Sequence, residues 1–188
     1  MVMNTAADGM DKLFQFQLEP VIYSKEIWEA YVIYCKNNGV IGNIHIELDT
    51  GMSRLGFSDT DDAWLLKEVT ALRGKVLSVF SHLAGADSEE HNQFSNNQID
   101  SFNARTQSIE NALGYNVPKH ILNSSGIVRF PNAHFDMVRL GIGLYGIEPN
   151  NQYQDQLKTV ATLKTTISQI RHIPVSYTHL TLPTNREV

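Results

Sequence analysis

Short apolar runs alternate with longer stretches of helical spacing along this chain, and this alternation limits the possible folds more than any other feature. The connections between the runs are short. Such an order implies a parallel sheet covered by helices, which is the α/β class. Strands are expected over residues 44–48 and 76–80, a strand that enters a polar turn over 120–125, and a strand and turn with close glycines over 137–144. Helices are expected over 9–18, 25–38, 60–72 and 92–113.

Polar or glycine-bearing turns follow the four expected strands. In α/β barrels the active site lies at the carboxyl ends of the strands, in the loops that follow them. Four such turns at corresponding places therefore indicate one shared site. The turns are Asp49–Gly51, Ser81–His82, Asn123–Ser125 and Arg139–Gly141.

Local patterns predict smaller details of the fold. Ser24 is a good N-cap for the helix over 25–38, and residues 1–4 are typical of a strand end. The long helix has apolar residues at helical spacing. Its expected core positions are Phe94, Ile99, Phe102 and Ile109.

The composition is that of a globular chain and excludes several classes of partner. The 188 residues include 15 Lys and Arg against 20 Asp and Glu, a formal net charge of −5 without a basic cluster. This argues against nucleic acid and anionic membrane as main partners.

No apolar run reaches the roughly 18 residues of a membrane helix, and no signal peptide is expected. The single cysteine, Cys35, excludes an internal disulfide, and no metal-ligand spacing occurs, so no metal is expected.

The stretch from Asp49 to Phe57 is the most informative motif. One interpretation is a tight turn in which Asp and Thr side chains bond the backbone and Arg54 is a surface residue. The other is a guanidinium fixed at a strand end, where it can bind a carboxylate or a cofactor oxygen. The residues alone support both interpretations equally.

Three other motifs also have a functional and a plain structural interpretation. His82 follows an apolar strand, and a histidine there is either structural or catalytic. Residues 123–126 form either a helix cap or an anion-binding nest. The three glycines within 141–146 either close a barrel or let the backbone approach a phosphate. Their spacing does not match the GxGxxG dinucleotide fingerprint.

The motifs stand in an order, and at intervals, that are typical of one family. They are Asp49-Thr50-Gly51-Met52 with Arg54-Leu55-Gly56, Ser81-His82, Asn123-Ser124, Phe135-Asp136-Met137-Val138-Arg139, and Gly141-Ile142 with Leu144-Tyr145-Gly146. Together they resemble alanine racemase, a pyridoxal-phosphate enzyme that interconverts L- and D-alanine. The amino-acid sequences of residues 45–52 and 91–94 further resemble the branch of the family in which the racemase is fused to a ligase that adds D-alanyl-D-alanine to the cell wall.

The resemblance implies a division of the chain. Residues 1–149 would be part of a (β/α)8 TIM-type barrel. Residues 150–174 would be a linker and the first strand of a C-terminal β domain, and 175–188 a non-native tail.

The resemblance also implies catalytic roles. Arg139 would pair with the pyridine nitrogen of pyridoxal 5′-phosphate, and His82 would pack on the cofactor ring. Arg54 would contact the phenolate oxygen and the substrate carboxylate. A guanidinium stays protonated and keeps the ring nitrogen unprotonated, which weakens the electron sink and favours racemisation over other carbanion chemistry.

The phosphate of the cofactor has its own implied binding residues. Ser124 and the N–H groups of Gly141 and Ile142 would hold it, with Asn123 beside them. Many family members carry a carbamylated lysine seven residues before the arginine that is Arg54 here, and Glu47 stands in that place. A carbamate is anionic, so we expect Glu47 to supply the same charge and to orient Arg54 without modification.

Two bases that the family uses have no counterpart in this sequence. The Schiff-base lysine lies in a Lys-Ala-Xaa-Xaa-Tyr-Gly-like motif, whereas Lys12 and Lys25 lie on expected helices. The family's catalytic tyrosine comes from the β domain, and Tyr177 in the tail does not match it. Racemisation needs two bases on opposite faces of the α-carbon. The chain is therefore expected to be an internal piece that is inactive alone, binds the cofactor weakly and, with open barrel edges, dissolves poorly.

The resemblance implies a cytoplasmic homodimer that acts on alanine for peptidoglycan synthesis. Another racemase or a D-amino-acid aldolase of the same fold type is one alternative, and Arg54 with Arg139 and Leu144–Gly146 argues against it. A non-catalytic pyridoxal-phosphate-binding barrel is a second, and residues 161–167, which resemble the first strand of the racemase β domain, argue against that. An unrelated α/β domain is the third.

Overall fold

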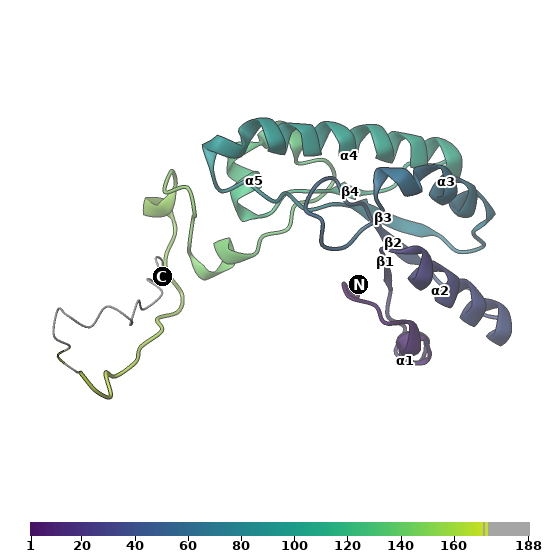
Figure 1. The fold of residues 1–188 in the computed structure, drawn as a ribbon, viewed down its shortest axis with the longest axis horizontal. Helices are drawn as coiled ribbons and strands as arrows, with labels where there is room; N and C mark the ends of the chain where they lie inside the picture. The colour runs from purple at the N-terminus through teal and green to yellow at the C-terminus, as the bar shows by residue number, and fades with distance from the viewer. Residues whose placement is uncertain (171, 173–188) are drawn as a thin grey trace.

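The computed structural model of this protein describes residues 1–170 and 172. Helices and strands alternate along it as the apolar pattern predicts, and Figure 1 shows their arrangement. The principal elements are α1 (Met10–Gln15), β1 (Val21–Ile22), α2 (Lys25–Asn38), β2 (Ile44–Glu47), α3 (Asp62–Ala71), β3 (Val76–Phe80), α4 (Asn92–Leu113), β4 (Lys119–His120) and α5 (Ser124–Arg129). Short 3-10 helices complete the set: η1 (Ala7–Gly9), η2 (Asp59–Asp61), η3 (Glu89–His91), η4 (Pro131–Ala133), η5 (Ile142–Tyr145) and η6 (Gln154–Gln156).

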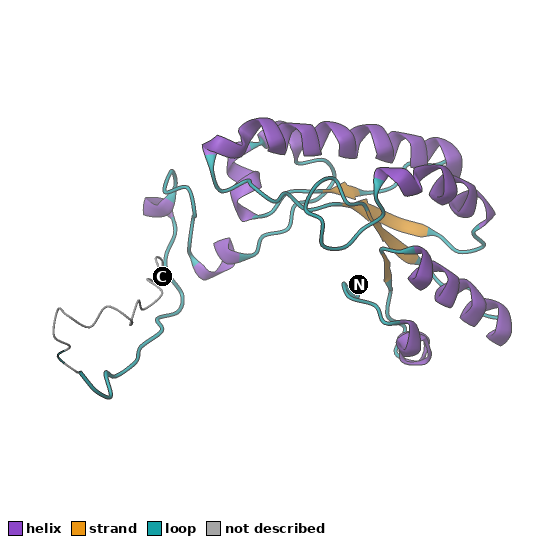
Figure 2. Ribbon diagram, viewed as in Figure 1, coloured by secondary structure: helices purple, strands orange, loops and turns teal. Residues whose placement is uncertain are grey.

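The four strands form one parallel sheet in the order β1-β2-β3-β4. Each strand pairs with the one before it, and a helix fills each connection, which is how parallel strands are joined. The chain start adds to the sheet edge through a parallel bridge from Val2 to Pro20, so the strand end expected over 1–4 is present. Figure 2 shows the twisted sheet with the helices packed along it.

The two faces of the sheet have different chemistry. Ile22, Ile46 and Val79 face the helices and belong to the hydrophobic core, together with Trp28 of α2 and Phe102 of α4. The opposite face carries mostly polar side chains, with Val21 and Phe80 as its apolar members. By strand register the side chains of this face are Val21, His45, Glu47, Ser78, Phe80 and His120. All of them are buried, although the face is mostly polar.

The predicted helix signals are confirmed where the local chemistry is strong. The Ser24 hydroxyl accepts a hydrogen bond from the Ile27 N–H, which caps α2 as expected. The long helix α4 has the predicted bounds, 92–113, and ends at Gly114 in the left-handed conformation.

One predicted core position in α4 is wrong. Phe94 is 41% exposed, whereas Phe102 and Ile109 are buried and Ile99 is partly buried against the core. Phe94 lies in the first turn of α4, where its ring covers Gly51 rather than the sheet. A Cβ atom at Gly51 would come within 2.9 Å of the Phe94 Cζ.

Of the strand and turn predicted over residues 137–144, the turn is present but the strand is not. The N–H groups of Asp136 and Arg139 donate to the carbonyls of Lys119 and Leu122, so the segment lies beside β4. No ladder forms, because Phe135 has a positive φ of 48° and the chain turns at Gly141 into η5. This turn, rather than a strand, brings the backbone of 141–143 to Ser124.

The segment beyond η6 extends away from the sheet (Figure 1). Residues 157–170 have no helix or strand, so the strand expected over 161–167 is not formed in this structure. Leu163 is 95% exposed. The tail 175–188, including Tyr177, lies outside the described residues.

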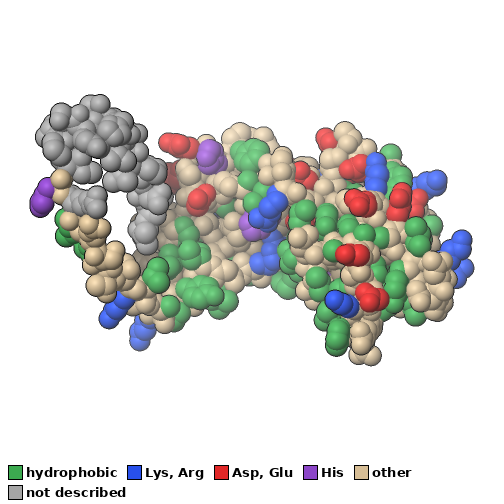
Figure 3. Space-filling model, turned by 60° about the horizontal axis from the view of Figure 1, so that its bottom comes forward, with side chains coloured by type: hydrophobic (Ala, Val, Ile, Leu, Met, Phe, Trp, Pro, Cys, Tyr) green, Lys and Arg blue, Asp and Glu red, His purple; other side chains and the backbone are tan. Residues whose placement is uncertain are grey.

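None of the described helices is both long and apolar enough to cross a lipid bilayer. On the face shown in Figure 3, acidic and basic side chains are interspersed over the helical part of the molecule. Apolar side chains are also exposed there, and several of the exposed apolar residues lie after α5. These include Met137, Leu140, Ile142, Leu144 and Tyr145.

Candidate active site

The loops that follow β2, β3 and β4 meet at the carboxyl end of the sheet. Thr50, after β2, shares a 2.8 Å hydrogen bond with Ser81, after β3. Gln98 of α4 donates to both the Thr50 hydroxyl and the His82 carbonyl, which ties these two loops to the long helix. The sequence-based expectation of one shared site therefore has a geometric basis.

Arg139 connects the ends of β3 and β4. Its Nη2 donates to the carbonyls of Ser81 at 2.6 Å and Ile121 at 3.3 Å, and to His82 Nδ1 at 3.2 Å. Its Nη1 donates to His120, through both Nδ1 and the carbonyl oxygen. Among the described residues, the third donor group, Nε–H, has no hydrogen-bond partner. The guanidinium is thus fixed at two nitrogens and can still donate from the third.

Burial and neighbouring charges set the protonation states in this region. Burial, then the positive charges of Arg139 and Arg54, lower the pKa of His82 to about 4. His82 is therefore neutral near pH 7, and its Nδ1 accepts from Arg139. Burial lowers the pKa of Arg139 to about 10, an effect that Glu47 opposes, so the guanidinium remains charged at neutral pH.

Glu47 is an almost fully buried carboxylate, 3% exposed, on the polar face of the sheet. Burial raises its pKa, while the positive charges of Arg54 and Arg139 lower it. Its Oε2 is buried without a hydrogen-bond partner among the described residues. Within this same part of the chain no hydrogen bond joins Glu47 to Arg54, so the charge of Glu47 acts on both arginines through space.

Arg54 lies in an exposed part of the loop between β2 and η2. The loop is held internally, because Asp49 Oδ1 accepts hydrogen bonds from the N–H groups of Gly51 and Ser53. Gly56 has a φ of +110°, and a Cβ atom there would lie 2.4 Å from the Asp49 nitrogen. The two interpretations of this motif are therefore compatible. The motif forms a tight turn, and this turn presents the Arg54 side chain.

Ser124 accepts two backbone hydrogen bonds from the turn at 141–143. The donors are the N–H groups of Gly141 at 2.9 Å and Gly143 at 3.1 Å. Asn123 caps α5 by accepting from the Gly126 N–H and also donates to the Leu83 carbonyl. Converging N–H groups beside a hydroxyl form an anion-binding nest.

The residues present fit pyridoxal phosphate. Arg139 has a free N–H donor for a ring nitrogen, and the Ser124 hydroxyl, whose oxygen accepts from the N–H groups of Gly141 and Gly143, can donate its own hydrogen to a phosphate. The nest also has room beside Ser124, since a Cβ atom at Gly141 would lie 3.8 Å from the Ser124 hydroxyl oxygen.

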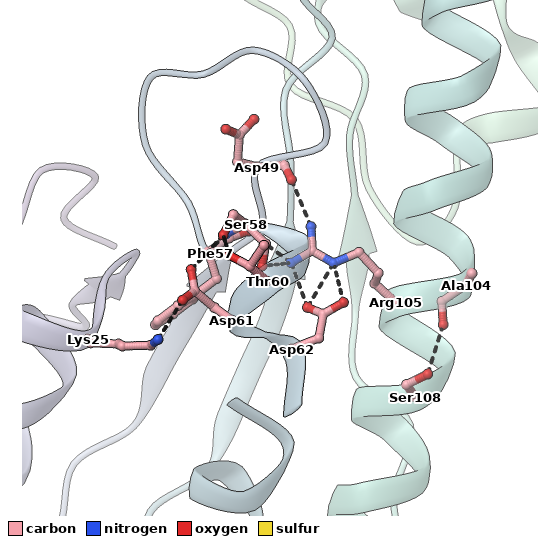
Figure 4. A network of polar contacts seen from close by, with 10 residues as sticks. All are labelled: Lys25, Asp49, Phe57, Ser58, Thr60, Asp61, Asp62, Ala104, Arg105 and Ser108. Atoms are coloured by element: carbon pink, nitrogen blue, oxygen red, sulfur yellow. Dashed lines mark hydrogen bonds and ion pairs between the residues drawn. The ribbon is translucent and has the colours of Figure 1, made fainter. Parts of the chain in front are cut away.

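Arg105 of α4 was not predicted from the sequence, and it holds the loop that carries Arg54 (Figure 4). Its Nε and Nη2 donate to the Asp62 carboxylate at 2.7 to 3.0 Å. Its Nη1 donates to the Asp49 carbonyl at 2.7 Å, and Nη2 to the carbonyls of Phe57 and Ser58 at 2.8 and 2.9 Å. The signal that could have found it is an arginine on the apolar stripe of a helix, three residues after Phe102 and four before Ile109.

Comparison with known proteins identifies the family. Residues 1–149 match the family model of the alanine racemase N-terminal domain. The chain belongs to the alanine racemase N-terminal domain family. Its parallel sheet and surrounding helices are accordingly part of a TIM-type barrel.

Curated relatives agree with this assignment. The chain is 33% identical over 183 residues to alanine racemase 1 of Oceanobacillus iheyensis, covering 92% of this chain and 48% of that protein. It is 34% identical over 179 residues to alanine racemase of Carboxydothermus hydrogenoformans, covering 93% of this chain and 48% of that protein. The chain thus spans about half the length of the curated relatives it matches.

Solved structures share the fold. The alanine racemase of Bartonella henselae, with covalently bound pyridoxal phosphate, has a TM-score of 0.71 and 26% identity, covering 84% of this chain and 45% of that one. The alanine racemase of Clostridium difficile 630 has a TM-score of 0.72 at 23% identity, covering 83% of this chain and 41% of that one.

Replacing Arg105 should release the 49–58 loop. We predict that Arg105→Lys lowers the free energy of unfolding by on the order of 3 kcal/mol, because one ammonium cannot serve the Asp62 carboxylate and three carbonyls together. Urea denaturation measures the loss, and amide hydrogen exchange should show its largest increase within 49–58. Arg73→Lys, at an exposed arginine, is the control. An unchanged exchange pattern in Arg105→Lys would contradict this role.

Acid should destabilise the fold through its buried histidines. The pKa of His82 is about 4 and that of His120 about 3, both below the ordinary 6.5, so the unfolded chain binds more protons between these values. Their stabilisation is complete above pH 6.5 and is lost as the pH falls toward 4 and 3. We expect His82→Gln to reduce the loss of unfolding free energy between pH 7 and 5 by on the order of 1 kcal/mol. Urea midpoints at both pH values test this, with exposed His91→Gln as the control.

Proposed function

We propose that this chain forms the cofactor-holding part of an alanine racemase, in which L- and D-alanine are interconverted on pyridoxal 5′-phosphate. The observation that carries the proposal is Arg139, whose Nη1 and Nη2 are held by the strand ends while Nε–H is left to donate. The family membership and the nest at Ser124 support it.

Bound pyridoxal phosphate would supply an electron-withdrawing ring that loosens the α-proton of an amino acid. Arg139 would donate from Nε to the ring nitrogen, and because its pKa of about 10 keeps it protonated, that nitrogen would stay unprotonated. The electron sink would then be weak, which favours return of the proton over other reactions. Neutral His82, bonded to Arg139, would pack on the ring.

Arg54 would bind the substrate carboxylate and stabilise the negative charge that develops beside it. The tight turn at 49–57 presents its side chain to solvent at the same end of the sheet as His82. Glu47 would orient Arg54 through charge, since the buried carboxylate and the guanidinium influence each other. No modified lysine is required for this role.

The whole reaction would need more than this chain. The sequence has no Lys-Ala-Xaa-Xaa-Tyr-Gly-like motif for the Schiff-base lysine, and no residue of it matches the family's second base. We propose that the chain alone does not racemise alanine, and that the complete protein acts as a cytoplasmic homodimer supplying D-alanine for peptidoglycan.

Cofactor binding can be measured without a Schiff base by using pyridoxamine 5′-phosphate, which cannot react with surface lysines. We expect the chain to bind it at least tenfold more tightly than pyridoxamine, because the nest at Ser124 holds the phosphate. Ser124→Ala should remove most of this preference, and Ser125→Ala, which alters a neighbouring hydroxyl not bonded to the nest, should retain it. Fluorescence titration measures both. Equal affinity for the two ligands would exclude this phosphate site.

The role of Glu47 is testable in a racemase of full family length that carries this sequence. We expect Glu47→Gln to lower kcat/KM for alanine by about tenfold, since a neutral side chain no longer balances the Arg54 charge, and Glu47→Asp to retain part of the activity. Conversion of L- to D-alanine is the measurement. Wild-type activity in Glu47→Gln would show that Arg54 needs no such partner.

A further inference from the structure

A row of polar side chains crosses the polar face of the sheet and ends at Arg139. Glu19 Oε2 lies 3.0 Å from His45 Nε2, and His45 Nδ1 lies 2.7 Å from the Ser78 hydroxyl. The same hydroxyl lies 3.3 Å from His120 Nε2, and His120 Nδ1 accepts from Arg139 Nη1. The three middle members lie on β2, β3 and β4. We call this set the inner-face row: Glu19, His45, Ser78, His120 and Arg139.

The chemistry of its two ends gives the row one direction. A guanidinium only donates, so His120 Nδ1 must accept and its proton must lie on Nε2. That N–H donates to the Ser78 hydroxyl, whose single hydrogen then goes to His45 Nδ1. The proton of His45 therefore lies on Nε2 and is donated to Glu19, whose carboxylate only accepts. With both histidines neutral, a donor at one end and an acceptor at the other give the same orientation at every link, whereas a doubly protonated His45 would donate to both Glu19 and Ser78.

The surroundings of Ser78 and His120 favour this directed arrangement. Ser78 and His120 are 3% and 0% exposed, so neither exchanges its partner for water. The His120 ring is stacked on Phe80, with centroids 4.9 Å apart and planes 5° apart, which fixes its rotation. Burial and the charge of Arg139 lower the pKa of His120 to about 3. His120 thus stays an acceptor toward Arg139 at neutral pH.

We propose that Glu19, His45 and Ser78 are positioning residues that act through His120 to hold the Arg139 guanidinium in place for the cofactor. The effect on the cofactor rests on the proposed function, whereas the hydrogen-bonded row itself does not. Glu19 precedes β1 and its side chain is 45% exposed, whereas Arg139 lies at the carboxyl ends of the strands. The row therefore connects a carboxylate at the amino end of the sheet to the candidate active site at the other end.

Reversing the exposed end tests the direction of the row. Glu19→Lys places a donor at each end, so the row can no longer run in one direction, and either His45 or His120 must change its tautomer or lose its bond. Glu19→Gln can still accept through its amide oxygen and should behave as the parent does. Glu29→Lys makes the same charge change on the exposed surface of α2, outside the row.

The readout is the tautomer of each histidine, taken from long-range ¹H–¹⁵N correlation spectra of the ¹⁵N-histidine-labelled chain. In the parent chain, Glu19→Gln and Glu29→Lys, His45 and His120 should both carry their proton on Nε2. In Glu19→Lys, His45 should move its proton to Nδ1 and the His120 ring signals should shift. A purely structural role for Glu19 would leave the tautomers unchanged.

Cutting the row at Ser78 supplies the second test. In the double variant Ser78→Ala with Glu19→Lys, the His120 signals should return to those of Ser78→Ala alone, because the change at Glu19 can no longer reach His120. A proton on His120 Nδ1 in the parent, or His120 signals that ignore Glu19→Lys, would overturn the inference.

Affinity for pyridoxamine 5′-phosphate should fall at least threefold in Glu19→Lys and remain unchanged in Glu19→Gln. A loss of equal size in both variants would overturn the link to Arg139. If the parent chain shows the expected tautomers yet binds no pyridoxamine 5′-phosphate, the proposed function fails while the directed row stands.

Discussion

The candidate site depends on one partly buried cation, the Arg139 guanidinium. It donates to the carbonyls of Ser81, His120 and Ile121 at the ends of β3 and β4. A charged donor strengthens these bonds and fixes the spacing of the two strand ends. Burial, together with the same charge, lowers the pKa values of His82 and His120, so Arg139 contributes to the protonation of the residues around it as well as to their positions.

A second arginine has a comparable role on the helix side. Arg105 reaches over the loop after β2 and binds three of its carbonyls as well as Asp62, so the turn that presents Arg54 is held from outside the sheet. Lysine lacks the planar fork needed for such multiple contacts. The two arginines therefore have separate roles, since Arg105 holds the loop in place and Arg139 joins the strand ends.

Much of the fold follows from local chemistry and could be predicted. The Ser24 cap, the bounds of α4 and the parallel order of the strands rest on short-range patterns, and the structure confirms them. The errors arise where long-range contacts decide. The 137–144 segment has strand-like residues, but its position is set by the hydrogen bond from the Arg139 N–H to the Leu122 carbonyl and by those from Gly141 and Gly143 to Ser124, and no ladder forms there.

In the candidate site, too, local features could be predicted and long-range contacts could not. The sequence located the turns that carry Arg54, His82 and Arg139, because each motif is contiguous. It did not reveal Arg105 or the hydrogen bond from the Gly143 N–H to Ser124, since each joins segments far apart in the chain. Every residue has a backbone carbonyl, so a side chain that donates to carbonyls can have partners of almost any residue type. A single sequence therefore shows no pair of residues that would reveal such a contact.

The order of the sheet has a consequence for how the molecule forms. Each strand pairs with the strand immediately before it, and no strand must be inserted between two earlier ones. Parallel sheets usually fold slowly, because long connections must close before their pairings are gained. Here each helix and strand can add to a surface that already exists, so these four strands can be added in order from β1 to β4 while the chain is being synthesised. Arg139 arrives last and binds strand ends that are already in place.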